Sequence, residues 1–349
     1  MNHPIQIVGG GLAGLLLGIR LLREGVPVTL VEAGQYPRHR ICGEFLSGNG
    51  VRILEENGLL EPLLERGARR ASQVAFYSST KLLQQFEIPD PAICISRFQF
   101  DQALVDSFQR AGGELITGMR FRPQEGQGDT GVVWAIGRNQ KNRDPQGWRW
   151  FGLKMHAQAV ELEADLEMHL HENAYIGLCR VEGGSVNLCG LFRNRPGEPD
   201  AFRRPMEEVL SGPIGSILNE RTSNAKFLPE TRCAVGGLDL LPKKAVDHST
   251  CRVGDSVTMI PPLTGNGMSM ALESADASTA PLASYSRGGI SWEQARALAA
   301  SSMDQRFESR LYWARLLQRF LFLPVGREVA LEVSRRLPFL WTSGFLRTR

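Results

Sequence analysis

A glycine-rich turn close to the N-terminus constrains the fold of this chain more than any other feature. An apolar strand over residues 5–8 runs into Gly9, Gly11 and Gly14, spaced as G-x-G-x-x-G, and apolar residues at helical spacing follow. A second apolar strand then ends at Glu32. In such a strand–turn–helix–strand unit, the first glycine allows the tight turn and the second lets the backbone approach a pyrophosphate. The third lets the helix pack closely against the strand.

The chemistry of this unit predicts a dinucleotide site. The helix N-terminus offers free N–H groups and a positive dipole end to phosphates. Glu32 follows the turn by about 20 residues, where a carboxylate can accept hydrogen bonds from ribose hydroxyls. The strand, the helix and the acid agree, whereas a lone glycine turn would be weak support. The alternative is an ordinary turn between a strand and a helix.

Composition limits the class of protein. The chain has 349 residues, 42% hydrophobic and 22% charged, which fits a globular protein of two domains or one large domain. Its net charge of +3 is too small to predict nucleic-acid binding. The six cysteines show no C-x-x-C or zinc spacing, so we expect reduced, mostly buried thiols and a cytoplasmic location. No metal site is predicted. Residues 1–4 leave no room for a signal peptide, and the apolar run over 12–22 is too short to span a bilayer.

A second motif follows the predicted dinucleotide unit. Residues 38–40 are Arg-His-Arg in a loop without periodicity, and their cations predict a position over the phosphates. Arg40 to Ser47 then spell R-x-C-G-E-x-L-S before a helix. Together with the glycine turn and the acid, this run resembles flavoproteins of the geranylgeranyl reductase and aromatic-hydroxylase superfamily, which includes the group A monooxygenases. The resemblance implies FAD, a Rossmann-like domain of the glutathione-reductase type, and a cysteine, here Cys42, near the flavin ring edge. The alternative for Cys42 is a small buried apolar residue.

Two further segments extend the resemblance. Arg97 to Leu104 match the family pattern R-x-x-F-D-x-x-L, which places Arg97 against the cofactor. From the residues alone, a surface ion pair with Asp101 is the alternative for that arginine. Residues 115–121 are expected to form the third parallel strand, and 132–138 the strand that returns under the flavin.

The most specific match comes late in the chain. Gly254-Asp255 follows an apolar strand, and Pro262 to Met268 spell P-x-T-G-x-G-M before an Ala- and Ser-rich helix. Asp255 can accept a hydrogen bond from the ribityl chain. The glycine turn and helix N-terminus can stabilise negative charge on the reduced flavin. The predicted FAD contacts are Gly9, Gly11, Leu12, Ala13, Gly14, Glu32, Ala33, Arg40, Cys42, Arg97, Ala135, Gly137, Gly254, Asp255, Pro262, Thr264, Gly265, Asn266, Gly267 and Met268.

The middle of the chain has a different pattern. Alternation over 73–86 and 148–192 predicts antiparallel strands, with a glycine-containing hairpin loop at 182–185. Such a sheet can place one face on a core and the other on a cavity. Lys154 and His156 share one face by period two, so they are candidate substrate-side groups unless both point to solvent. The candidate catalytic residues are Cys42, Glu44, Lys154 and His156.

Three parts are therefore expected: a Rossmann-like α/β FAD-binding domain, an antiparallel β-sheet substrate domain and a C-terminal helical segment. Their predicted boundaries are 1–72 plus 95–147 plus 243–286 for the first, 73–94 plus 148–242 for the second and 287–349 for the third. The C-terminal segment holds eleven arginines and five acidic residues. Its basic face is either solvated or a dock for an acidic carrier protein or an anionic membrane surface.

The predicted function is that of an FAD-dependent oxidoreductase. No second G-x-G-x-x-G is present, so electrons come from transiently bound NAD(P)H or another donor. Apolar and aromatic residues in the expected substrate sheet favour a hydrophobic or aromatic molecule, lipid- or polyketide-like, from secondary metabolism. A monooxygenase is the first expectation, and a carbon–carbon reductase or dehydrogenase of the geranylgeranyl reductase type is the alternative. Halogenation is less expected because the chain has no W-x-W-x-I-P segment. A non-catalytic FAD-binding electron carrier would lack an enclosed substrate cavity.

Overall fold

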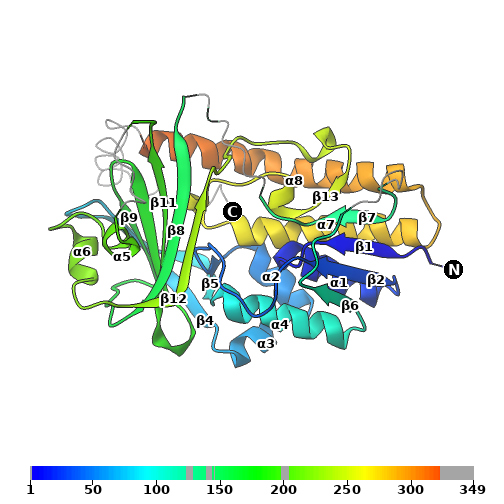
Figure 1. Cartoon of the computed structure of the whole chain (residues 1–349), viewed down its shortest axis with the longest axis horizontal. Coiled ribbons are helices and arrows are strands. Elements are labelled where there is room, and N and C mark those ends of the chain that lie inside the picture. Colours follow the sequence, from blue (N-terminus) through cyan, green and yellow to red (C-terminus); the bar gives the residue numbers. More distant parts are fainter. Residues whose placement is uncertain (1, 123–128, 139–143, 145, 198–203, 323–349) are drawn as a thin grey trace.

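The computed structural model describes residues 2–122, 129–138, 144, 146–197 and 204–322. Figure 1 shows two β-sheets beside each other, one parallel and surrounded by helices, the other antiparallel. Two long helices, α7 (Gly267–Ser286) and α8 (Trp292–Leu321), run along the molecule. This arrangement confirms the fold class expected from the sequence, a Rossmann-like part joined to an antiparallel sheet with helices towards the C-terminus.

The parallel sheet carries the glycine turn at its centre. Its five strands lie in the order β13-β7-β1-β2-β6, and every neighbouring pair is parallel. The strands are β1 (Ile5–Val8), β2 (Val28–Glu32), β6 (Glu114–Thr117), β7 (Val132–Trp134) and β13 (Cys251–Arg252). Ile5 and Ile7 of the central strand are buried, as expected for a parallel sheet covered on both faces. The strands end together at one edge, which is where ligands bind in such sheets.

Helices around this sheet bury the apolar faces that the sequence predicts. Helix α1 (Leu12–Arg23) begins directly after Gly11, and its leucines pack into the core. Helices α4 (Arg97–Arg110) and α7 pack against α1, while α2 (Asn49–Glu56) packs against α7. The short helix α3 (Leu60–Glu65) contacts α2 and α4.

The antiparallel sheet has eight strands in the order β12-β8-β11-β10-β9-β4-β5-β3. All neighbours are antiparallel except β4 and β9, which run parallel. The hairpin predicted around 182–185 joins β10 to β11. The strands are β3 (Phe45–Leu46), β4 (Arg69–Tyr77), β5 (Leu82–Cys94), β8 (Arg149–Gln158), β9 (Leu166–Leu170), β10 (Ala174–Arg180), β11 (Val186–Asn194) and β12 (Lys226–Gly236).

The register of this sheet decides which side chains face the FAD-binding part. Lys154 lies opposite Cys189, which lies opposite Gly177. Directly opposed residues share a face, and so do residues two apart on one strand. Lys154 and His156 therefore share the face of Cys189 and Gly177. The other face of β8, with Phe151, packs in a separate apolar cluster with the two short helices α5 and α6.

Some elements differ from the sequence expectation. The segment over 206–221 forms two short helices, α5 (Met206–Leu210) and α6 (Ile217–Arg221), rather than one, because Gly212 at φ +72° and the following proline interrupt it. The strand expected over 115–121 ends at Thr117. Helix α8 is one continuous helix to Leu321, and residues 323–349 of the expected C-terminal segment lie outside the described residues. The domain boundaries stay predictions. Among the described helices, none combines the length and the apolar character that crossing a membrane requires.

Candidate active site

A cavity of about 630 Å³ lies between the two sheets, and most of the predicted cofactor contacts line it. Gly14 and Asn266 lie outside this lining, and the side chain of Thr264 is not among the described parts of the chain. The predicted residues in the lining are Gly9, Gly11, Leu12, Ala13, Glu32, Ala33, Arg40, Cys42, Arg97, Ala135, Gly137, Gly254, Asp255, Pro262, Gly265, Gly267 and Met268. The fold therefore brings three sequence motifs, which begin at Gly9, Arg40 and Gly254, to one cavity.

The glycine turn has the geometry that its spacing predicts. Gly9 has φ +111°, and a Cβ there would lie 2.4 Å from the carbonyl oxygen of Ala135. A Cβ on Gly14 would lie 2.1 Å from the carbonyl oxygen of Gly9, so helix α1 can approach β1 only without a side chain at this position. By contrast, nothing lies within 4 Å of a Cβ on Gly11. This open space faces the cavity at the start of α1, where a pyrophosphate would meet the helix N-terminus.

Glu32 lies at the end of the cavity that the glycine turn forms. Its carboxylate accepts hydrogen bonds from the backbone N–H groups of Gly10 at 2.7 Å and Gly34 at 2.8 Å. Arg38 lies 2.8 Å from one carboxylate oxygen and Arg40 lies 3.5 Å from the other. Burial alone would raise the pKa of Glu32, but the backbone N–H groups and the Arg38 guanidinium outweigh it and hold this pKa below its ordinary value. The carboxylate is thus ionised and held in place at neutral pH.

The motif over residues 254–268 forms the opposite end of the cavity. Gly254 has φ +65°, and a Cβ there would lie 2.9 Å from the Cβ of Ala13, so this turn packs against α1. Asp255 lines the cavity beside it. Burial raises the pKa of Asp255, while the positive charges of Arg138 and Arg97 oppose that rise. Helix α7 begins at Gly267 without a side-chain cap, which leaves its first N–H groups directed at the cavity.

These features fit FAD. One end offers a carboxylate for ribose hydroxyls and an open helix N-terminus for phosphates, and the other offers an aspartate and a second helix N-terminus for the flavin. Arg97 makes two contacts with Asp101, at 2.7 and 2.9 Å, and also lines the cavity. The cofactor contact and the ion pair, which the sequence posed as alternatives, are therefore compatible.

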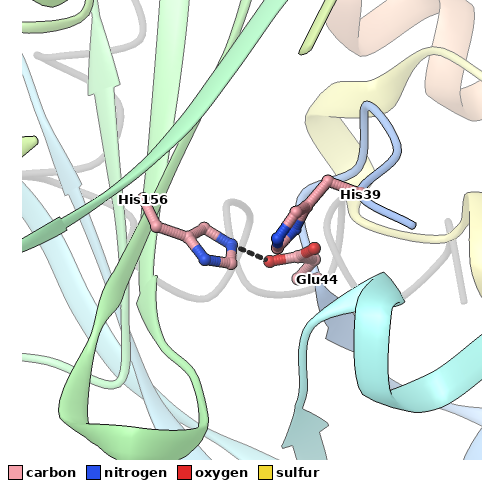
Figure 2. A group of neighbouring side chains, drawn as sticks. All are labelled: His39, Glu44 and His156. Carbon is pink, nitrogen blue, oxygen red and sulfur yellow. Dashed lines mark hydrogen bonds and ion pairs between the residues drawn. The ribbon is translucent and has the colours of Figure 1, made fainter. Parts of the chain in front are cut away.

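Glu44 stands in the cavity wall, at the centre of a buried group of polar side chains. Its carboxylate accepts hydrogen bonds from Lys154 Nζ at 2.8 Å, His156 Nε2 at 2.7 Å and the backbone N–H of Arg97 at 2.8 Å. His39 joins the group, with its Nδ1 3.5 Å from Lys154 Nζ. Figure 2 shows His39, Glu44 and His156 converging from different elements of the chain. We call these four side chains, His39, Glu44, Lys154 and His156, the Glu44 network.

The charges of the Glu44 network are strongly coupled. Burial would raise the pKa of Glu44, but Lys154 and His156 outweigh it, so the pKa lies below its ordinary value. Burial and the nearby Lys154 and His156 lower the pKa of His39 to about 4, which keeps this imidazole neutral at pH 7. Glu44 also has φ +56°, a left-handed backbone that is uncommon outside glycine. Its side-chain contacts hold it in that conformation.

The structure places the predicted catalytic residues in two positions. Glu44 and Cys42 line the cavity, whereas Lys154 and His156 lie one layer behind, in contact with Glu44. Cys42 Sγ accepts the backbone N–H of Glu44 at 3.4 Å. Burial raises the pKa of the Cys42 thiol, so it is protonated at neutral pH. Whether these residues act in catalysis stays a prediction. The absence of a metal also stays a prediction, and it agrees with the position of the Lys154 ammonium, which supplies a cation between His39 and Glu44.

Several cavity residues were missed by sequence reasoning. Arg138 follows the predicted Gly137 directly and faces Asp255, so its place at a strand end could have revealed it. Trp134 and Phe121 form an edge-to-face pair at 5.7 Å in the lining. Tyr175, one of the aromatic residues that the sequence placed in the expected substrate sheet, lines the cavity from β10, although its orientation depends on a sheet register that the sequence does not show.

Comparison with known proteins agrees with this geometry. Residues 2–143 match the family model described as FAD binding domain. Over 120 residues the chain is 31% identical to a 1H-pyrrole-2-carbonyl-[peptidyl-carrier protein] brominase of Pseudoalteromonas luteoviolacea. Over 112 residues it is 31% identical to 6-methylpretetramide 4-monooxygenase of Streptomyces rimosus. These matches span 34% and 31% of this chain, and only 29% and 27% of the two relatives.

Solved structures match over nearly the whole chain. The flavin-dependent brominase Bmp2 is 18% identical, with a TM-score of 0.75 over 100% of this chain and 93% of that one. PqsL of Pseudomonas aeruginosa, in complex with 2-aminobenzoylacetate, is 16% identical, with a TM-score of 0.71 over 94% of this chain and 99% of that one. At such identities the likeness establishes the fold. Residues 2–143 therefore match an FAD-binding domain family, and the chain as a whole has the fold of these flavin-dependent enzymes.

Proposed function

We propose that this protein is an FAD-dependent monooxygenase that acts on a hydrophobic, aromatic small molecule. The observation that carries the proposal is the composition of the cavity, which continues past the cofactor motifs onto the face of the antiparallel sheet. There the lining is mostly apolar, with one hydroxyl and the thiol of Cys189, and includes Leu166, Met168, Tyr175, Leu191, Val235 and Leu238. A mostly apolar pocket with few polar groups suits a planar, hydrophobic molecule better than a sugar or a polyacid. An electron carrier would need no such space.

The hydroxyl of Tyr175 is the polar group that would orient the substrate. The side chain is 4% exposed, and its hydroxyl finds no hydrogen-bond partner of good geometry among the described residues. Burial raises the pKa of Tyr175 well above its ordinary value, although the nearby N–H of Leu263 opposes the rise. The hydroxyl therefore keeps its proton and has it free to donate. An acceptor oxygen on the substrate, such as a carbonyl or phenol, would satisfy it.

The chain's own residues divide the remaining work. The glycine turn, Glu32 and Arg40 hold the adenosine and phosphate side, while Asp255 and the N-terminus of α7 hold the flavin side. When bound, FAD supplies the redox chemistry with molecular oxygen. The apolar sheet face excludes water, and the Glu44 network provides titratable groups at the wall. Transiently bound NAD(P)H is the proposed electron donor, because no second dinucleotide motif is present in the sequence.

Relatives support the substrate class. One is a 6-methylpretetramide 4-monooxygenase, another a 3-amino-4-hydroxybenzoate 2-monooxygenase of Streptomyces platensis. A structure of similar fold is p-nitrophenol 4-monooxygenase from Pseudomonas putida DLL-E4. All three act on aromatic molecules by name, and we carry that class over to this chain as part of the proposal.

Halogenation is the second candidate, and the likeness to a brominase in both sequence and fold favours it. That brominase acts on a pyrrole carried by a peptidyl-carrier protein, so a carrier-bound substrate belongs to this candidate. The basic C-terminal segment would be the dock for such a carrier, but all of its arginines after α8 lie outside the described residues. The cytoplasmic location and the reductase alternative also stay proposals.

A single assay separates these candidates. FAD-loaded protein receives NADH or NADPH, a panel of aminobenzoates and phenols, and ¹⁸O₂, with or without bromide. Incorporation of one ¹⁸O atom into product supports the monooxygenase. A brominated product that forms only with bromide supports the halogenase. Substrate reduction or dehydrogenation under strict anaerobiosis supports the reductase branch and overturns the proposal.

A further inference from the structure

The Glu44 network connects the cavity to a half-buried histidine on the opposite side of the wall. Glu44 touches the cavity. Lys154 Nζ bridges Glu44 at 2.8 Å and His39 Nδ1 at 3.5 Å, and neither Lys154 nor Glu44 has any exposed surface. His39 is half-buried and stacks on Phe98 with ring centroids 4.9 Å apart. The groups thus form a continuous line of proton donors and acceptors from the cavity wall outwards.

The surroundings of this line offer few competing partners. Glu44 is faced by Lys154 and His156 from β8, by the backbone N–H of Arg97 from α4, and by the thiol of Cys42. Cys189 and Cys233 lie opposite Lys154 on the two neighbouring strands, and burial raises the pKa of both thiols. A hydrogen bond with Cys94, together with burial, raises the pKa of Cys179, so all three thiols stay protonated. Around His39 the charges are those of Lys154, Glu44 and Glu230, and its ring meets His156 edge-on at 5.3 Å.

A contribution to stability does not by itself explain why the chain buries the charged Glu44 network. Taking an ammonium and a carboxylate out of water costs as much as their attraction returns, and an apolar pair of the same volume is often as stable. The network also holds Glu44 in a left-handed backbone conformation. Strained backbone of this kind tends to persist where it serves a function. A line of exchangeable protons that ends on the cavity is a function the geometry can serve.

We propose that Glu44, Lys154 and His39 form a proton path between the flavin cavity and the outside of the protein. The path rests on the proposed function only in requiring that FAD occupies the cavity. Lys154 Nζ gives a proton to the Glu44 carboxylate, which passes it on to an acceptor bound against the wall. Lys154 takes its replacement from His39 Nδ1, and His39 takes one from water. One proton enters the cavity, and every group regains its starting state; deprotonation of a bound molecule runs in reverse.

His156 is a positioning residue in this path. Its Nε2 holds the second oxygen of the Glu44 carboxylate at 2.7 Å, which leaves the first oxygen for Lys154. His39 is the slowest carrier. With a pKa of about 4 it is protonated in about one molecule in a thousand at pH 7, so inward transfer should quicken about tenfold for each unit that the pH falls.

The test measures proton uptake directly and needs no substrate. FAD-loaded protein is photoreduced without oxygen and mixed with oxygenated, weakly buffered solution that contains a pH-indicator dye. Anionic reduced flavin, O₂ and one proton give oxidised flavin and hydrogen peroxide, so one proton is taken up per flavin. We expect His39→Gln to slow this uptake at least tenfold. Imidazole added to His39→Ala should restore it. His248→Gln is the matched control, because His248 is half-buried and bonded to the carbonyl of Val257, away from the network.

A second measurement uses FAD-free protein. NMR titration should find the His39 ring well below its ordinary pKa, and Lys154→Met should raise it. Uptake in His39→Gln at the native rate, or a His39 ring that titrates normally in the native protein, overturns the path. Failure to bind FAD overturns the proposed function but leaves the titration as a test of the network. Normal proton uptake with no oxygenated product overturns the monooxygenase alone.

Discussion

Lys154→Met should destabilise the protein because it leaves the buried Glu44 carboxylate without its positively charged partner. Lys154 and Glu44 are both fully buried, and Nζ lies 2.8 Å from Oε1. Removing one partner of such a pair costs about 3–5 kcal/mol, since the remaining charge loses its compensation. Glu44 keeps the hydrogen bonds from His156 and from the Arg97 backbone N–H. Each is worth about 1.5–3 kcal/mol to a charged acceptor, so we expect a loss near the lower end, about 3 kcal/mol.

The loss should depend on pH in a direction that the charges fix. In the native protein the pKa of Glu44 is lowered, so its contribution is present above its unfolded pKa and disappears as pH falls through the folded pKa. Without Lys154, burial dominates and the folded pKa of Glu44 should rise above the unfolded one. The variant then folds with a protonated Glu44 at low pH, and its deficit should be largest near pH 8 and shrink towards pH 5. The limiting slope is about 1.4 kcal/mol per pH unit.

Urea unfolding of the native protein and the Lys154→Met variant at pH 5 and pH 8, at one saturating FAD concentration, measures the loss in free energy of unfolding at each pH. Glu44→Gln/Lys154→Met completes a double-mutant cycle and should recover most of the loss, since a neutral pair leaves no stranded charge. Arg52→Met is the matched control: the Arg52–Glu56 pair has a similar 2.9 Å distance but is exposed, and its loss should stay below about 1 kcal/mol. A Lys154→Met loss equal to the Arg52→Met loss, and equal at both pH values, would refute a buried ion pair.

Four other substitutions test the site. Gly11→Ala should fold normally yet bind FAD at least tenfold more weakly, because its Cβ would project into the open cavity. Gly9→Ala should also lower the midpoint of unfolding, because its Cβ would lie 2.4 Å from the carbonyl oxygen of Ala135. Equal unfolding curves for the two would contradict this steric reading. Cys42→Ser should keep FAD and turnover within about twofold, since the buried thiol is protonated; a hundredfold loss with FAD retained would establish a chemical role. Tyr175→Phe should weaken binding of 1-naphthol, followed by the flavin spectrum, and leave naphthalene binding unchanged.

Most of the cofactor-binding residues predicted from the sequence line one cavity, because that side of the site is built from local patterns. Gly9 and Gly254 have positive φ and close neighbours that only glycine tolerates, and such requirements leave a mark in the sequence. Glu32 was found because strand ends and helix starts follow each other at a fixed interval in this type of unit. Each motif carries its own geometry, so the fold had only to bring the motifs together.

The substrate side could be predicted only in part, because it depends on pairings between distant strands. Period two placed Lys154 and His156 on one face, but only the register with β11 shows that this face looks towards the cavity. Glu44 precedes them by more than a hundred residues, and nothing local indicates that it would accept hydrogen bonds from both. The place of His39 in the network follows from the path of its loop, which no periodicity describes.

That loop gives the site a property that neither side has alone. Arg38 and Arg40 contact Glu32 on the adenosine side, while His39 between them contacts Lys154 on the substrate sheet. Consecutive residues of one short segment therefore hold the cofactor carboxylate and the buried ammonium. A bound adenosine that draws Glu32 or Arg40 towards it must also move the backbone that carries His39. FAD binding should thus change the distance between His39 and Lys154, and with it the pKa of His39. A His39 titration that is identical in the FAD-free and FAD-loaded protein would show that the two ends of the loop move independently.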